Sequence, residues 1–102
     1  MTRTRLPPKD RRELLLAAAL EEANIVGYLK VTRQGVADRA GVAPALISSY
    51  FGTMPSLRRV IMRAAVSQRI LTVVAQGIVA RDRFALDAPE ELKSKALAAL
   101  AN

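Results

Sequence analysis

The sequence predicts an all-α fold of about five helices, and three observations support this class. Apolar residues recur at helical spacing along most of the chain, capping residues precede several of these stretches, and no strand pattern stands out. A chain of 102 residues is one domain with a single core. We expect a helix-turn-helix region over residues 10–54, then a long helix and a short C-terminal helix over 55–102 that complete the core and dimerise.

The first nine residues, MTRTRLPPK, are predicted to form a flexible basic arm. They contain too few apolar residues to build a core, and Pro7-Pro8 stiffens their end. Arg3 and Arg5 are free to reach a minor groove or phosphates of duplex DNA. A solubilising tail without a binding role explains the same residues equally well.

The first helix is predicted to start at Asp10, with Glu13 three residues later as in a capping box, and to end near Val26. Gly27 is a typical residue after a helix C-terminus. The residues expected to face the core recur at helical spacing: Leu15, Leu16, Ala19, Leu20, Ala23 and Val26.

Two short helices joined by a tight turn follow, and they are the most informative part of the chain. Thr32 is the expected cap of a helix from Arg33 to Ala40, Gly41 permits the corner, and Pro44 opens a helix that runs to about Tyr50. Helix-turn-helix proteins that read duplex DNA have this arrangement, and their second helix enters the major groove. Gly35 inside the first of these helices indicates either a close backbone neighbour or a weak spot.

The longest predicted helix runs from about Pro55 to Arg81 and carries apolar residues on two nearly opposite faces. One face is Leu57, Val60, Ile61, Ala64, Leu71, Ala75 and Ile78; the other is Met62, Val66, Ile70, Val73, Gly77 and Ala80. Both faces must be covered. The first three helices can cover one of them. We expect a homodimer to cover the other, through the second face together with Leu92 and Ala96 of the last helix.

The alternative is that the last helix, Pro89 to Ala101 with Asp87 as its cap, covers the second face by itself. This helix is short and rich in alanine, which favours the dimer.

Composition narrows the possible functions. The net charge is +7, and residues 1–63 hold eleven lysines and arginines against five acids, whereas residues 64–102 hold five against four. The basic part therefore coincides with the helix-turn-helix, as expected for a polyanionic partner. The chain contains no Cys and no His, which removes thiolate and imidazole metal sites, Cys nucleophiles and a His general base. An Asp/Glu or Ser/Lys enzyme remains the alternative, but the sequence shows no constellation of nucleophile and base, so we expect no metal, no cofactor and no enzyme.

The apolar runs 14–20 and 70–80 are too short to span a membrane, and Glu13, Glu21 and Glu22 flank the first of them. We expect no membrane partner and a cytoplasmic, nucleoid-associated location in a bacterium. A membrane-surface role for the basic arm and first helix is the alternative, and the same three acids argue against it.

The segment resembles the DNA-binding domain of the tetracycline-repressor (TetR) family over roughly residues 10–61. The matching residues are Gly27-Tyr28, Thr32, Val36-Ala37, Arg39-Ala40-Gly41-Val42, Ile47, Tyr50-Phe51 and Leu57. Three positions depart from the family pattern: Glu22-Ala23 replaces two large apolar residues, Ala43 replaces a serine-like cap, and Met54 replaces a phosphate-contacting lysine. Family members also usually continue into a ligand-binding domain, so the resemblance implies a minimal member without a large inducer pocket.

The resemblance implies base reading by Gln34 and phosphate contacts from Thr32, Arg33 and Tyr50. The second helix of the motif offers DNA its outward face: Pro44, Ala45, Leu46, Ser48 and Ser49. Alanine and leucine can meet a thymine methyl, and serine can bond a base edge or a phosphate. Lys30 and Arg58 are further phosphate candidates. Each of these residues can also be an ordinary surface or capping residue.

We therefore expect a homodimeric, sequence-specific transcriptional regulator, most simply a repressor that binds an inverted repeat in double-stranded DNA. No small-molecule inducer is expected, and control by protein concentration follows. The alternative is a sequence-tolerant DNA-coating protein or an adaptor that docks on another regulator, because the recognition helix carries no Arg or Asn.

Overall fold

The computed structural model describes residues 8–101, and its regular elements in this range are all helical. Their bounds are α1 Pro8–Val26, the 3-10 turn η1 Tyr28–Lys30, α2 Arg33–Ala40, α3 Pro44–Phe51, α4 Met54–Gln68, α5 Leu71–Val79, α6 Arg83–Leu86 and α7 Glu90–Ala101. The predicted all-α class is therefore confirmed. None of the described helices has the length and hydrophobicity needed to cross a membrane.

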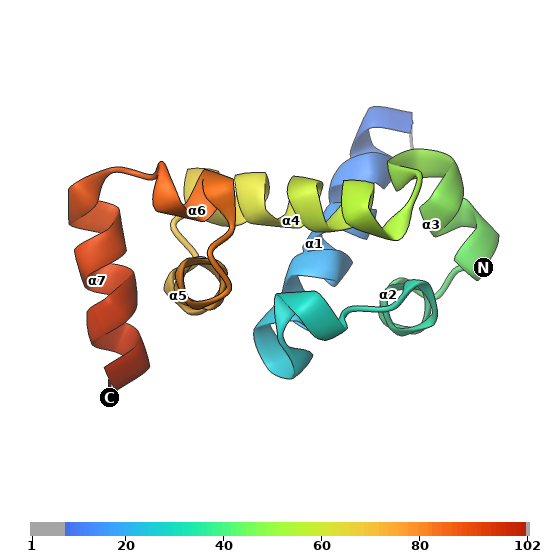
Figure 1. Ribbon diagram of the computed structural model, residues 1–102. Helices are drawn as coiled ribbons and strands as arrows, with labels where there is room; N and C mark the ends of the chain where they lie inside the picture. Colours follow the sequence, from blue (N-terminus) through green and yellow to red (C-terminus); the bar gives the residue numbers. More distant parts are fainter. Residues whose placement is uncertain (1–7, 102) are drawn as a thin grey trace.

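Helix α4 runs along the middle of an elongated molecule that measures 46 × 23 × 22 Å (Figure 1). Helices α2 and α3 lie at one end of it and α7 lies at the other, with α5 and α6 between α4 and α7 (Figure 1). One continuous core joins all these elements. Its largest fully buried side chains are Leu15, Val36, Ile47, Leu57, Ile61, Met62, Val73, Val74 and Leu92.

Helix α1 follows the sequence prediction closely and ends where expected. Gly27 adopts a positive φ of 96°, and its N–H donates to the carbonyl oxygen of Ala23 at 2.9 Å. Most of the predicted inward residues are buried, but Val26 is exposed. It lies at the point where α1 turns into η1, away from the packed part of the helix.

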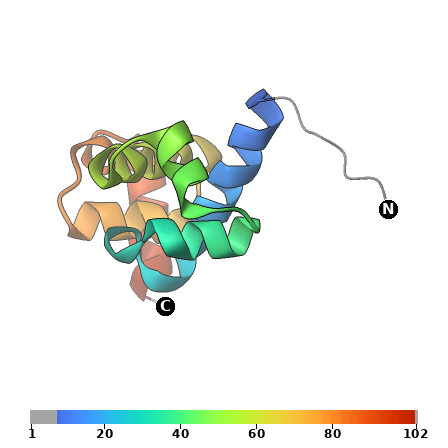
Figure 2. The same cartoon turned by 90° about the vertical axis from the view of Figure 1, so that its right-hand side faces the viewer.

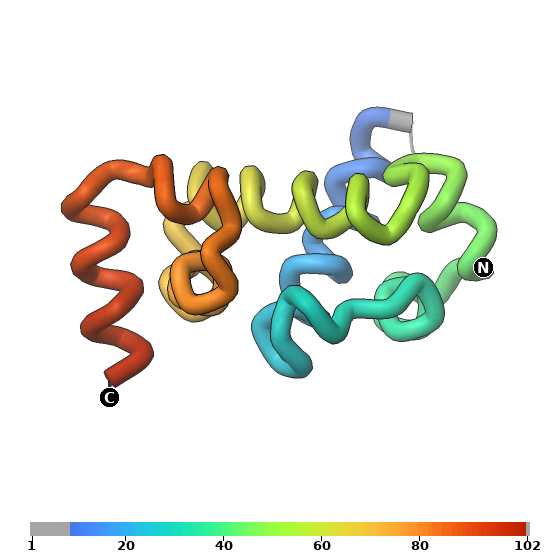
Figure 3. Tube along the Cα trace, in the orientation of Figure 1, coloured from blue at the N-terminus to red at the C-terminus, as the bar shows by residue number. Residues whose placement is uncertain are grey.

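The prediction of one long helix from Pro55 to Arg81 is wrong, because the chain breaks into α4 and α5 at Arg69-Ile70 (Figure 3). Arg69 takes a left-handed conformation with φ 58°, and Ile70 is extended. The Arg69 N–H bonds back to Ala65 and Val66, which closes the last turn of α4.

This break buries both apolar faces within a single chain. Helix α5 packs on α4 and α7 packs on α5, so each shields surface that a straight helix would leave open. The approach is close at Gly77, where an added Cβ atom would lie 2.7 Å from the Cβ of Ala85 and 2.8 Å from the sulfur of Met62. Only a residue without a side chain fits there.

The same packing changes the role of the residues predicted for a dimer face. Met62, Val73, Gly77, Leu92 and Ala96 are buried within their own chain, so they are not available to a partner. Val66 and Ile70 are half-buried and pack against this core, and Ala80 alone of the eight is exposed. Of these eight residues, only Ala80 is fully open to a partner, so an interface between two copies would have to use mainly other side chains.

The short helix α6 was not expected, and it changes the predicted start of the last helix. Asp82 caps α6, since its Oδ1 atom accepts the N–H groups of Phe84 at 2.9 Å and Ala85 at 3.2 Å. Asp87, predicted as the cap of the last helix, instead ends α6. Helix α7 begins at Glu90, and a 2.8 Å ion pair between Arg69 and Glu91 ties it to the end of α4. This hydrogen-bonded arginine holds the pKa of the Glu91 carboxyl below its ordinary value.

Replacement of Gly77 by valine should lower the free energy of unfolding by about 1–3 kcal/mol, the usual cost of overpacking a core. The reason is the close approach of Met62 and Ala85 to this position. Urea denaturation followed by circular dichroism measures the change. Ala98→Val, at an exposed position of α7, is the control and should shift the midpoint little. Equal midpoints for the two variants would show that α5 is not held this closely.

Candidate nucleic-acid interface

Helix α2 starts at a side-chain cap supplied by Thr32. The Oγ1 atom of Thr32 accepts the N–H of Gly35 at 3.0 Å, so one of the free donors at the helix start is satisfied. Arg33 and Gln34 follow in the first turn and are exposed. The first turn of α2 thus combines unpaired backbone N–H groups with a guanidinium group, which suits a phosphate.

The turn between α2 and α3 is built by Gly41. It adopts the left-handed conformation with φ 71°, and its N–H donates to the carbonyl oxygen of Ala37. Ala43 offers no side-chain cap, so Pro44 sets the first turn of α3 by its fixed φ angle. Helix α3 runs from Pro44 to Phe51, one residue beyond the predicted end.

Two buried side chains fix α3 on the core. Ile47 and Phe51 are almost fully buried, and the guanidinium carbon of Arg12 lies 5.2 Å from the centre of the Phe51 ring. Tyr50 is half-buried and its ring lies 6.4 Å from that of Phe51. The opposite face of α3 is left for a partner, and it looks out from the end of the molecule with α2 (Figure 2).

The structure places most of the predicted DNA-binding residues at this end. Ala45 and Ser49 are exposed, whereas Pro44, Leu46 and Ser48 are partly covered. Thr32, Arg33 and Gln34 lie at the start of α2, and α2 packs on α3. Arg3 and Arg5 lie outside the described residues.

Gln34 is already engaged within its own helix. Its Nε2 atom donates to Oδ1 of Asp38, one turn later, at 2.7 Å. A base contact by the amide nitrogen would have to displace this bond, while the amide oxygen accepts no side-chain hydrogen bond within residues 8–101. Asp38 also adds a negative charge next to Gln34, on the exposed side of α2, which would weaken attraction to DNA there.

A buried carboxylate holds α2 against α1. Glu22 is almost fully buried, and Arg39 of α2 donates to it through Nε at 2.6 Å and to Glu21 through Nη1 at 2.9 Å. The hydrogen bond to Glu22, with that to Glu21, raises the pKa of Arg39. Glu22, which departs from the family pattern, is therefore paired with Arg39.

The same carboxylate explains Gly35. A Cβ atom at position 35 would collide with the Glu22 side chain and lie 3.1 Å from the Thr32 hydroxyl oxygen. Of the two interpretations of this glycine, the close neighbour is correct, although that neighbour is a side chain and not backbone.

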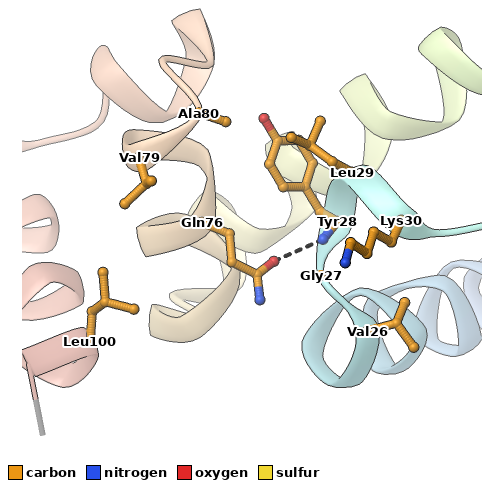
Figure 4. Close-up of a pocket in the computed structure, with 9 residues that line it drawn as sticks. All are labelled: Val26, Gly27, Tyr28, Leu29, Lys30, Gln76, Val79, Ala80 and Leu100. Carbon is orange, nitrogen blue, oxygen red and sulfur yellow. Dashed lines mark hydrogen bonds between the residues drawn. The ribbon is translucent and has the colours of Figure 1, made fainter.

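Tyr28 connects this end of the molecule to the C-terminal helices. Its backbone N–H donates to Oε1 of Gln76 on α5 at 2.9 Å (Figure 4). Its hydroxyl lies 3.4 Å from Oδ2 of Asp82. Burial, together with the charge and hydrogen bond of Asp82, raises the pKa of the Tyr28 phenol. Only Val31 separates η1 from Thr32, the cap of α2. The contacts of Tyr28 with Gln76 and Asp82 therefore help to set the position of α2.

Lys30 and Arg58 lie outside the helix-turn-helix, on η1 and α4. Lys30 is exposed on η1, and Arg58 on α4 is half-buried near enough to Tyr28 for its charge to lower that phenol's pKa against the larger raising effects. Four other arginines gather along the outer side of α4 and form no ion pair within residues 8–101: Arg12, Arg59, Arg63 and Arg83. The sequence analysis did not bring them together, because α6 was not expected.

A groove beside η1 was also missed. It has a volume of about 420 Å³ and separates the end of α1 and η1 from α5 and α7 (Figure 4). We call it the apolar groove and define it by Val26, Gly27, Tyr28, Leu29, Lys30, Gln76, Val79, Ala80 and Leu100. Sequence spacing alone gave no signal for it, because its walls come from four separate elements. Within residues 8–101, no three acidic side chains gather to hold a metal ion.

Replacement of Arg39 by methionine should destabilise the protein, because it leaves the buried Glu22 carboxylate without its donor. We expect the free energy of unfolding to fall by about 1–3 kcal/mol in urea denaturation. Arg59→Met removes an exposed arginine without an ion pair among the described residues and should have little effect. The double variant Glu22→Leu/Arg39→Met should recover part of the loss. No difference between the Arg39 and Arg59 variants would contradict this role for the pair.

Comparison with known proteins agrees with this geometry. A family model described as "Bacterial regulatory proteins, tetR family" matches residues 15–61, the stretch from α1 into α4 that contains the complete helix-turn-helix. No match was found among curated proteins or among solved structures. Residues 15–61 are therefore a DNA-binding domain of the tetR family, and the chain that carries them is a DNA-binding regulatory protein.

Proposed function

We propose that this protein is a homodimeric transcriptional repressor that binds an inverted repeat in duplex DNA. The observation that carries the proposal is the exposed face of α3 beside the capped first turn of α2, within the segment that the tetR family model matches. Each α3 helix would enter the major groove at one half-site. The repressor would act by occupying a promoter.

Phosphate contacts would supply most of the affinity. Arg33 and Thr32 lie at the start of α2, and the net charge of +7 favours a polyanion. If a dimer contacts about 6–10 phosphates, binding should weaken by about 10³–10⁵-fold between 50 and 200 mM salt.

Base contacts would come from small side chains. Ala45 and Leu46 suit thymine methyl groups, and Ser48 and Ser49 suit base edges or phosphates. Helix α3 has no Arg or Asn for a two-bond base contact, and the Gln34 amide nitrogen already bonds to Asp38. Specificity per half-site would thus be modest, and two half-sites would be needed for a strong operator. This same weakness supports the second candidate, a sequence-tolerant DNA-coating protein.

A gel-shift titration with DNA from immediately upstream of the protein's own gene should give a discrete complex of two chains per duplex. That complex should resist random duplex competitor and weaken steeply with salt. Such a result would also fit autoregulation by protein concentration, without a small-molecule inducer. Complexes that random DNA removes would favour the coating role, and no complex at low salt would refute DNA binding.

Replacement of Arg33 by alanine should weaken binding about equally on operator and random DNA, and should reduce the salt slope by about 1. The reason is the loss of one phosphate contact at the start of α2. Fluorescence anisotropy across a salt series measures both quantities. Arg83→Ala removes an exposed arginine from α6, which lies between α4 and α7 and away from α2, and should leave the slope unchanged. An unchanged slope for Arg33→Ala would remove this residue from the interface.

A further inference from the structure

The apolar groove is lined by residues outside α2 and α3, so it is not part of the proposed DNA-binding surface. Its floor lies between Tyr28 and Gln76, and the polar groups of these two residues are joined by the 2.9 Å hydrogen bond from the Tyr28 N–H. Three large apolar side chains stand on its walls and face solvent: Leu29 is 59% exposed, Val79 66% and Leu100 55% (Figure 4). Leu97, one turn before Leu100 on α7, is exposed as well.

These walls decide what kind of occupant fits. A small apolar molecule would fill the floor but leave the outer parts of Leu29, Val79 and Leu100 in water. A second protein surface can cover the floor and the walls together, which removes more apolar area from water. The groove therefore suits a macromolecular partner better than a small ligand.

We infer that the partner is a second copy of this chain, and that the apolar groove is the dimer interface. This inference rests on the proposed function, since an inverted repeat requires two reading surfaces related by a two-fold axis. It replaces the interface expected from sequence, most of which is buried within the single chain.

The shape of the molecule supports a side-by-side dimer at this groove. Pairing end to end through α7 would separate the two α3 helices by nearly twice the 46 Å length, well beyond half-sites about 34–36 Å apart. The groove is lined by residues of α1, η1, α5 and α7, so it lies away from α2 and α3 (Figures 1 and 4). Pairing at this groove about a two-fold axis parallel to the long axis would place both α3 helices at the same end of the dimer.

The thickness of the molecule is compatible with this arrangement. Each copy is 22–23 Å thick, so two copies side by side are wide enough for half-sites one turn of DNA apart. An ordinary interface takes about 800 Å² from each partner, about an eighth of the 6460 Å² that one chain exposes.

Charge also favours the groove over other surfaces. Two chains of net charge +7 repel one another, so an interface needs a weakly charged region. Among the described residues that line the groove, Lys30 is the one with a charged side chain. By contrast, the outer side of α4 carries four arginines without ion pairs in the described residues, and two copies would repel there.

Light scattering after size-exclusion chromatography tests the interface directly. Wild-type protein at tens of micromolar should have twice the mass of one chain, and Val79→Asp and Leu100→Asp should shift it to the mass of one. Leu14→Asp is the matched control, since Leu14 is 52% exposed on α1 outside the groove. Circular dichroism should show the same helix content for all four proteins.

Cross-linking keeps the test decisive if an aspartate variant folds poorly. The chain has no cysteine, so a single Val79→Cys or Leu100→Cys provides one reactive thiol per chain. A short bis-maleimide should join two chains of either variant, and Leu14→Cys should remain single. Equal cross-linking at all three positions would overturn the interface.

Two further outcomes separate this inference from the proposed function. A wild-type protein that is monomeric at these concentrations but binds its operator would overturn the interface and leave DNA binding intact. A wild-type protein that is a dimer, becomes a monomer with Val79→Asp and does not bind DNA would support the interface and refute the proposed regulatory function. Binding of an apolar fluorescent dye by a monomeric wild type, lost in Val79→Asp, would overturn the second copy in favour of a small ligand.

Discussion

The structure depends on one constraint, which is that the segment from residue 54 to 81 carries apolar side chains on two faces. A straight helix would need a separate cover on each side. The chain turns at Arg69 and Ile70 instead, and α5 packs across α4 (Figure 1). Helix α7 then packs on α5, and Gly77 admits Met62 and Ala85 at close range. The arrangement of the C-terminal half follows from this turn.

The N-terminal half was predictable because its signals are local. Thr32, Gly41 and Pro44 each fix one backbone feature within a few residues, and the observed bounds of α2 and α3 differ from expectation by at most one residue. The face that α3 offers was also predictable, since Ile47 and Phe51 had to be buried. The role of Gly35 was not, because it depends on a carboxylate thirteen positions earlier in the chain.

The break between α4 and α5 could not be read from sequence for a physical reason. Neither Gly nor Pro stands at residues 69 and 70, and a left-handed arginine has no strong local signature. What stabilises the break is burial of residues far apart in the chain, such as Met62 against Gly77. The apolar groove follows from the same non-local packing, and so the dimer face that sequence favoured had to be replaced.

Tyr28 has a consequence for how the molecule can be divided. Its backbone N–H depends on Gln76, its hydroxyl approaches Asp82, and both acceptors lie beyond the stretch that the family model matches. A fragment that stops at residue 61 would lose both acceptors and uncover the side of α4 that α5 shields. The family boundary is therefore not a folding boundary. The helix-turn-helix and the C-terminal helices should melt in one cooperative transition, so that a disturbance of α5 also displaces η1 and α2.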